Sequence, residues 1–191
     1  MTTMSPTLTT VPAGTLPALS DQVVLKSKRR VLPLGIDLAI TIDGTGSSQA
    51  FAAGIPATVR LIGDEISKKV ANMRVYLQKH GDLDYGEAPV MLTGRGMLDQ
   101  AYAEVDCIRF GGGGDAEEHH LDGVETLFEA VPWQGRQLQS RGCIILFATA
   151  DTKPLRSGAS ARELGERIRN AGVMLYAVCE PSAQLNEMVQ A

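Results

Sequence analysis

The fold of this chain is decided by the stretch Leu38-Ala39-Ile40-Thr41-Ile42-Asp43-Gly44-Thr45-Gly46-Ser47-Ser48. Its first half is apolar on both faces, which is typical of a central strand in a parallel sheet. A carboxylate and two hydroxyls follow at alternate positions, as Asp43, Thr45 and Ser47, and the glycines between them let the backbone turn tightly. Oxygen ligands suit Mg²⁺ or Mn²⁺, and open α/β sheets place their sites at the carboxyl ends of strands. The stretch therefore predicts a binding site more than a catalytic one.

The residues after this stretch alternate between helical and strand patterns. Strands are predicted at 35–43, 73–77, 88–92, 143–147 and 173–178, and the strand at 88–92 is expected to pair antiparallel with its predecessor through a polar turn. Helices are predicted at 55–70 and 97–105, after Asp115, after Ser160 and at 182–190. Strands that alternate with helices predict an α/β fold, doubly wound, with a mostly parallel sheet and helices on both faces.

Length and composition limit the classes of protein to which this chain can belong. The chain has 191 residues, which suits one ordinary domain. We expect a flexible arm at residues 1–30, where Thr, Pro, Ser and Gly dominate, and a globular domain at residues 31–191. The arm ends in a basic Lys-Ser-Lys-Arg-Arg segment that is interpreted as a solvated flank.

Charge and hydropathy exclude some partners. The formal net charge of −4 argues against nucleic acid. No stretch approaches the roughly 20 apolar residues of a membrane span. We expect no signal peptide, because the first residues are rich in Thr, Pro and Ser instead of a basic segment followed by an apolar run. The three cysteines fit neither a metal motif nor a simple disulfide framework, so a reducing, cytoplasmic setting is expected.

Two later carboxylates are candidates for the same site as Asp43. Asp115 follows a loop of four glycines, and Asp151 follows the predicted strand at 143–147. Loops after neighbouring parallel strands converge at one edge of a sheet, so we expect these residues to meet Asp43. Asp115 is also expected to cap the next helix, in a capping box with Glu118.

In this order, the motifs resemble those of the von Willebrand factor type A (VWA) family of intracellular type, over residues 33–180. Asp-Gly-Thr-Gly-Ser matches that family's Asp-x-Ser/Thr-x-Ser motif. The resemblance implies a Rossmann-like domain with a metal-ion-dependent adhesion site, or MIDAS. Thr45 and Ser47 would supply hydroxyl oxygens, and Asp43 and Asp151 would lie at the metal directly or through water. The ion would be Mg²⁺, Mn²⁺ or Ca²⁺, with an open position for a partner's Asp or Glu.

The sequence departs from the family pattern in three places. Gly114 stands where the family has a metal-binding threonine, and Asp115 or a water is expected to substitute for it. The second acidic motif is Thr-Ala-Asp where the family has Thr-Asp-Gly, which shifts Asp151 by one position. The chain also ends soon after the fifth predicted strand, so the domain is expected to be trimmed or covered by a partner at its open edge.

The resemblance implies a protein-interaction module that makes and breaks no bond. Its expected role is a subunit or adaptor of an intracellular complex that contains an AAA-type ATPase, a kinase or a stress-response assembly. Two alternatives stay open. One is a metal- or nucleotide-dependent α/β enzyme using Asp43, Ser47 and Asp151, and the other is a structural subunit whose metal site has decayed at Gly114.

Other motifs have simpler explanations. His119 and His120 suggest zinc, but adjacent histidines point about 100° apart on a helix and no third ligand stands at zinc spacing. This segment, with its acidic neighbours, is therefore predicted to be a solvated helix start. A dinucleotide site lacks its third glycine, because Gln49 occupies that position. A hydrolase would need a Gly-x-Ser-x-Gly frame, which Ser47 and Ser48 lack.

Overall fold

A computed structural model describes residues 35–94, 96–135 and 139–191. The chain divides into two units, Met1–Val31 and Leu32–Ala191, and every described residue belongs to the second. The arm predicted at residues 1–30 lies outside the described residues and stays a prediction. No described helix is long and apolar enough to cross a membrane.

The described part of the chain forms a five-stranded sheet in the order β3-β2-β1-β5-β7. These strands are β1 (Gly35–Asp43), β2 (Asn72–His80), β3 (Val90–Met91), β5 (Ser140–Phe147) and β7 (Val173–Val178). β1 pairs in parallel with β2 and β5, β5 pairs in parallel with β7, and β3 runs antiparallel to β2. A second, two-stranded parallel sheet joins β4 (Glu117–Glu118) to β6 (Asp151–Thr152).

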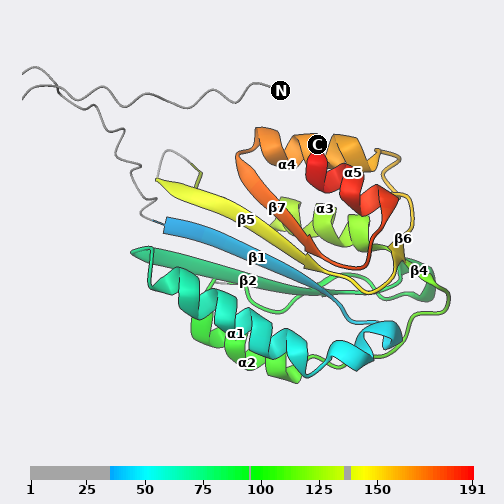
Figure 1. The fold of residues 1–191 in the computed structure, drawn as a ribbon, viewed down its shortest axis with the longest axis horizontal. Coiled ribbons are helices and arrows are strands. Elements are labelled where there is room, and N and C mark those ends of the chain that lie inside the picture. The colour runs from blue at the N-terminus through cyan, green and yellow to red at the C-terminus, as the bar shows by residue number, and fades with distance from the viewer. Residues whose placement is uncertain (1–34, 95, 136–138) are drawn as a thin grey trace, which may run out of the picture. The chain divides into compact units, whose positions relative to one another are not determined.

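Helices cover both faces of the sheet (Figure 1). They are α1 (Gly54–Ser67), α2 (Leu98–Cys107), α3 (His120–Ala130), α4 (Ala161–Asn170) and α5 (Ala183–Gln190), with 3-10 helices η1 (Gly46–Phe51) and η2 (Leu83–Tyr85). α1 and α2 lie on one face, and α3, α4 and α5 lie on the other. The predicted fold class is confirmed: the molecule has a Rossmann-like α/β architecture with a mostly parallel sheet.

The two faces of the sheet bury separate cores. Successive strand side chains point to opposite faces, so Ile144 and Leu146 of β5 pack with α3 and α4, whereas Ile145 and Phe147 pack on the side of α1 and α2. Every residue of β1 is buried, because this central strand is covered on both faces. The continuous apolar pattern of its sequence has this cause.

Most predicted elements are confirmed, and one helix start is wrong. α4 begins with the predicted capping box of Ser160 and Glu163. The chain leaves α4 through Gly172, whose φ of +77° favours glycine. In contrast, the helix predicted directly after Asp115 begins only at His120, because residues 117–118 take an extended conformation to pair with β6. The capping box predicted for Asp115 therefore does not form.

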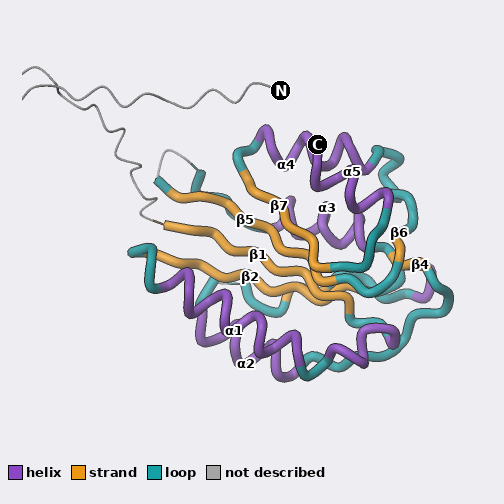
Figure 2. Tube along the Cα trace, in the orientation of Figure 1, coloured by secondary structure: helices purple, strands orange, loops and turns teal. Residues whose placement is uncertain are grey.

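The ends of the strands place the candidate site. The loops after β1 and β5 and the small β4–β6 sheet gather at one end of the main sheet (Figure 2). This is the carboxyl end of the parallel strands, where the sequence predicted the site.

Candidate metal centre

Side chains that follow β1 and β5 form a closed ring of oxygen atoms. Asp43 Oδ1 accepts a hydrogen bond from the Thr45 hydroxyl at 2.7 Å, and Thr45 Oγ1 lies 2.9 Å from Ser47 Oγ. Ser47 Oγ lies 3.0 Å from Thr149 Oγ1, and Thr149 donates to Asp43 Oδ2 at 3.1 Å, which closes the ring. Ser48 also donates to Asp43 Oδ2, at 2.7 Å, and its Oγ lies 2.9 Å from Thr149 Oγ1. We call these five side chains the hydroxyl ring.

Local backbone structure brings the ring together. Asp43 is the last residue of β1, and its Oδ1 also accepts the Thr45 backbone N–H at 2.9 Å, which turns the chain back over the carboxylate. The 3-10 helix η1 begins at Gly46 and carries Ser47 into the ring. Thr149 comes soon after the end of β5, the parallel neighbour of β1, so both segments end at the same edge.

The surroundings of Asp43 favour its ionised form. Burial opposes ionisation, but His80, the Thr45 backbone N–H and His120 act against burial and hold the pKa of Asp43 below its usual value. Burial and the neighbouring His120 lower the pKa of His80 to about 3. Burial also lowers the pKa of His120. Both histidines are therefore neutral near pH 7, and Asp43 carries the charge of the ring.

A buried hydrogen-bond chain beneath the ring fixes the tautomers of the two histidines. The Gln78 amide donates to Thr41 Oγ1 at 3.1 Å, which leaves the Thr41 hydroxyl to donate to His80 Nδ1 at 2.8 Å. His80 Nε2 then carries its proton and donates to His120 Nδ1 at 2.9 Å. The remaining nitrogen, His120 Nε2, is buried and has no hydrogen-bond partner among the described residues.

The loop of four glycines, residues 111–114, lies against the backbone of the ring. The N–H of its first glycine donates to the Gly44 carbonyl at 2.9 Å, and the Gly46 N–H donates to the carbonyl of its second glycine at 3.2 Å. A Cβ at Gly114 would lie 1.8 Å from the Tyr85 ring. A side chain at the position where the resemblance expects a threonine ligand would therefore require the exposed Tyr85 side chain to move.

Another buried carboxylate, Glu118, faces the ring from β4. The residue is 2% exposed, and its Oε2 has no hydrogen-bond partner in the described part of the chain. Burial and the charges of Asp43 and Asp82 raise the pKa of Glu118 to about 7, although the Thr45 hydroxyl lowers it. A cation in the ring would favour the charged form of Glu118, because a nearby opposite charge stabilises a carboxylate.

The donor set of the ring fits a small, hard cation. Mg²⁺ binds oxygen octahedrally at 2.0–2.1 Å, which places neighbouring ligands about 2.9 Å apart. The separations around the ring run from 2.7 Å to 3.1 Å. These are ordinary hydrogen-bond lengths, and they are also close to the spacing of neighbouring Mg²⁺ ligands. Ser47 is exposed, whereas Asp43 and Thr45 are fully buried. The ring therefore reaches solvent on the Ser47 side.

Two of the predicted ligands make their contacts elsewhere. Asp151 accepts hydrogen bonds from the Ser182 hydroxyl at 2.5 Å and the Thr152 N–H at 2.8 Å. Asp115 Oδ2 lies 3.1 Å from the ammonium of Lys153. Neither carboxylate has a hydrogen bond to the ring within residues 35–94, 96–135 and 139–191. Thr149 reaches Asp43 instead, because β5 has ended and the chain turns away to form β6.

A second group of ligand-type atoms is already occupied by basic side chains. Asp82, Asp84 and His119 each offer one atom within 4.8 Å of the others. Lys153 Nζ lies 2.8 Å from Asp82 Oδ2 and 2.9 Å from Asp84 Oδ2, and Arg156 Nε donates to His119 Nε2 at 3.3 Å. His119 Nδ1 lies 2.9 Å from Asp82 Oδ1 and accepts the Leu83 backbone N–H at 3.3 Å. We call this group, with Asp115, the lysine cluster.

The prediction of a solvated helix start at His119 and His120 is wrong. These residues are 4% and 0% exposed, and the neighbouring Glu118 and Asp122 are 2% and 7% exposed. Pairing of β4 with β6 draws the segment over the end of the sheet, and α3 then packs its first turn against His80. The local sequence shows that these residues are polar, but it does not show that the pairing of β4 with β6 and the packing of α3 bury them.

Sequence reasoning missed three residues of the site. Ser48 and Thr149 belong to the ring, and Glu118 faces it. Ser48 had a local signal, because it adjoins Ser47 directly after the motif. For Thr149 the only signal in the sequence was its position just after a predicted strand. For Glu118 the only signal was its position just after the loop of four glycines.

The fold is shared with a solved structure that has a metal site. Proximal thread matrix protein 1 from the mussel byssus, described with a zinc-occupied MIDAS motif, matches with a TM-score of 0.57 at 14% identity. The match covers 81% of this chain and 38% of that one, so this chain spans well under half of its length. No protein-family model and no curated protein matches the sequence. The structural likeness establishes a Rossmann-like fold consistent with the VWA fold.

Proposed function

We propose that this chain is a VWA domain that binds a partner protein through a divalent cation held by the hydroxyl ring. The observation that carries the proposal is the closed circuit of oxygens around Asp43, with separations suited to ligands of one ion. The order of the strands and the fold shared with a protein that has a zinc-occupied MIDAS motif support it.

The charges of the ring explain why a partner carboxylate would bind. Asp43 supplies one negative charge, and the hydroxyls of Thr45, Ser47 and Thr149 supply none. A divalent ion held this way keeps part of its positive charge and attracts an acidic side chain, and the exposed Ser47 side leaves room for one. Mg²⁺ is the ion that this oxygen donor set suits best.

The role that follows is recognition without chemistry. The domain would act as an adaptor or subunit of a cytoplasmic complex, in which an acidic residue of a neighbouring protein completes the metal site. The classes of partner suggested by the resemblance are AAA-type ATPases, kinases and stress-response assemblies.

Calorimetric titration with Mn²⁺ tests the metal site. We expect one ion per chain, with binding abolished in Asp43→Asn and retained in Asp115→Asn, which removes an exposed carboxylate outside the ring. Titration of acetate into the Mn²⁺-loaded protein tests the open position, because a carboxylate that displaces a bound water lowers the enhancement of water-proton relaxation by Mn²⁺.

Two results would contradict the proposal. Unchanged Mn²⁺ binding in Asp43→Asn would place the ion elsewhere. An unchanged relaxation enhancement with saturating acetate would mean that the ion offers no position to a carboxylate.

A further inference from the structure

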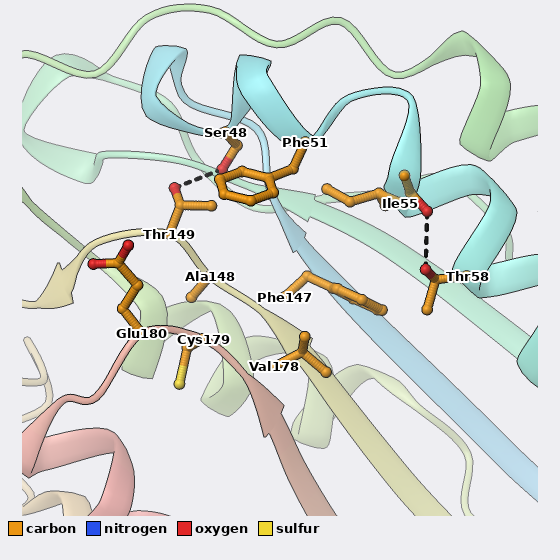
Figure 3. Close-up of a pocket in the computed structure, with 11 residues that line it drawn as sticks. Ser48, Phe51, Ile55, Thr58, Phe147, Ala148, Thr149, Val178, Cys179 and Glu180 are labelled. Atoms are coloured by element: carbon orange, nitrogen blue, oxygen red, sulfur yellow. Dashed lines mark hydrogen bonds between the residues drawn. The ribbon is translucent and has the colours of Figure 1, made fainter.

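An apolar groove begins directly at the hydroxyl ring. Its volume is about 420 Å³, and Ser48 and Thr149, two members of the ring, line one end of it. Figure 3 shows Phe51 beside this hydroxyl pair, with Phe147 and Val178 farther along the groove. The lining comes from η1, the start of α1 and the ends of β5 and β7, so three separate parts of the chain build the groove.

Uncovered apolar side chains surround the groove. Phe51 is 53% exposed and Val178 is 52% exposed, although both are large apolar residues. Tyr176, two residues before Val178 on the same face of β7, is 53% exposed as well. β7 is an edge strand of the described sheet, and its face on the α1 side extends beyond the part that α1 and α2 cover. Contiguous exposed apolar surface of this kind marks interaction sites.

The size and chemistry of the groove suit one kind of side chain. A cavity of about 150 Å³ holds benzene, so this groove has room for a large aliphatic or aromatic group. At its ring end Ser48 Oγ lies 2.9 Å from Thr149 Oγ1, and the Thr58 hydroxyl lies in another part of the lining. Glu180 lines another part and is exposed, so a second acidic group there would meet a like charge.

We infer that the groove receives an apolar side chain next to the carboxylate that completes the metal site. The inference rests on the proposed function, because the carboxylate fixes the partner at the ring. Residues one or two positions away along an extended chain lie within about 7 Å, and the groove shares Ser48 and Thr149 with the ring. The ligand class is therefore a protein segment in which a single Asp or Glu has a large apolar neighbour.

Short synthetic peptides test this pairing. The probes are acetylated and amidated five-residue peptides, Gly-Gly-Glu-Gly-Gly, the same peptide with Leu before or after Glu, and the Leu peptides with Gln in place of Glu. Dissociation constants are measured by NMR titration of the labelled full chain in Mg²⁺. Burial of one leucine side chain gives at least about a tenfold preference for a Leu–Glu pair over Gly-Gly-Glu-Gly-Gly.

A glycine in the groove offers a variant that fills it. Gly54 lines the groove, and a Cβ there meets no atom within 4 Å, so Gly54→Leu fits the helix start and is expected to narrow the groove. Gly94→Leu is the matched control, because Gly94 has the same freedom and lies outside the groove lining. We expect Gly54→Leu to lose the preference for leucine and Gly94→Leu to keep it, with Mn²⁺ affinity equal in both.

The outcomes separate this inference from the proposed function. Suppose that Mn²⁺ binds and that acetate displaces its water. Three results would then overturn the groove inference alone: equal affinities of wild type for the Leu and Gly peptides, no peptide binding up to 10 mM, or a preference for leucine that survives in Gly54→Leu. Equal binding of the Gln and Glu peptides would also overturn it. Absence of Mn²⁺ binding would overturn both proposals.

Discussion

Two groups of carboxylates occupy the carboxyl end of the sheet, and they differ in what surrounds them. In the lysine cluster, Lys153 Nζ lies within 3.1 Å of three carboxylates. In the hydroxyl ring, the Asp43 carboxylate accepts hydrogen bonds from the hydroxyls of Thr45, Ser48 and Thr149. One group carries its own cation, whereas the other has neutral donors around a buried charge.

The difference shows that an acidic cluster alone does not define a metal site. Burial opposes the charged form of Lys153, but Asp82, Asp84 and Asp115 outweigh burial and raise its pKa. Likewise, the bond from Lys153 lowers the pKa of Asp82 against the effect of burial. A metal ion would have to displace this ammonium from the lysine cluster, but would only have to turn hydroxyls in the ring.

Removal of the ammonium is the strongest test of the comparison. Lys153→Met is expected to lower the free energy of unfolding more than any other change proposed here, because the fully buried Asp82 would lose its ammonium partner. Guanidinium unfolding measures the change. Lys68→Met, which breaks an exposed pair with Glu65, is the control and should cost less than about 1 kcal/mol. Equal losses in the two variants would contradict the structural role of Lys153.

The same variant should convert the lysine cluster into a metal site. With Lys153 replaced by Met in an Asp43→Asn background, Zn²⁺ is expected to bind Asp82, Asp84 and His119, whose ligand atoms lie within 4.8 Å of one another. At about 100 times its dissociation constant, the ion would add about 2.7 kcal/mol of stability in a thermal unfolding series. If Asp43→Asn with Lys153 intact gains as much from Zn²⁺, the lysine does not exclude the ion and the comparison fails.

The charges of Asp43 in the hydroxyl ring and of Asp82 in the lysine cluster both raise the pKa of Glu118. The free energy of unfolding should therefore depend on pH through Glu118. Its pKa is about 7 in the folded chain and about 4.5 as a free side chain, so its ionisation destabilises the fold progressively from pH 4.5 to pH 7 and fully above pH 7. Measured in EDTA, Glu118→Gln should gain about 1–3 kcal/mol relative to wild type between pH 5 and pH 8. Glu117→Gln, at the exposed neighbouring position, is the control. A constant difference across this range would refute the pKa.

The smallest expected effect is the loss of Mn²⁺ affinity when Thr149 is replaced. It distinguishes Thr149, which the structure places in the ring, from Asp151, which the sequence predicted as a ligand. Thr149→Val removes a ring hydroxyl with little change in shape and should weaken Mn²⁺ binding about tenfold, or by about 1.4 kcal/mol. Asp151→Asn should change it less than twofold, because Asp151 bonds to Ser182 and Thr152. Calorimetry on the two variants decides between them, and the reverse order would restore Asp151 as the ligand.

Local sequence patterns were sufficient for the fold and for one side of the site. The apolar run before Asp43 indicated a central strand, and helical spacing from Ile55 onward indicated α1, because both signals depend on residues a few positions apart. The contact of Thr45 with Asp43 was also predictable, since it spans two residues. The glycine loop at 111–114 lies beside Asp43, as expected from the convergence of loops at one edge of a parallel sheet, although Asp115 at its end does not reach the ring.

Only the tertiary structure decided which distant side chains complete each group. The hydrogen bond from Thr149 to Asp43 spans 106 residues, and the pair of Lys153 and Asp82 spans 71. Whether Thr149 or Asp151 meets Asp43 depends on where β5 ends and β6 begins, a boundary that apolar periodicity leaves uncertain by a few residues. The sequence by itself determined that a carboxylate and hydroxyl side chains stand at and directly after the end of β1. Long-range packing determined that Thr149 completes the ring around Asp43 and that the Lys153 ammonium lies among Asp82, Asp84 and Asp115. Thr149 and Lys153 are far along the chain from the carboxylates that they contact.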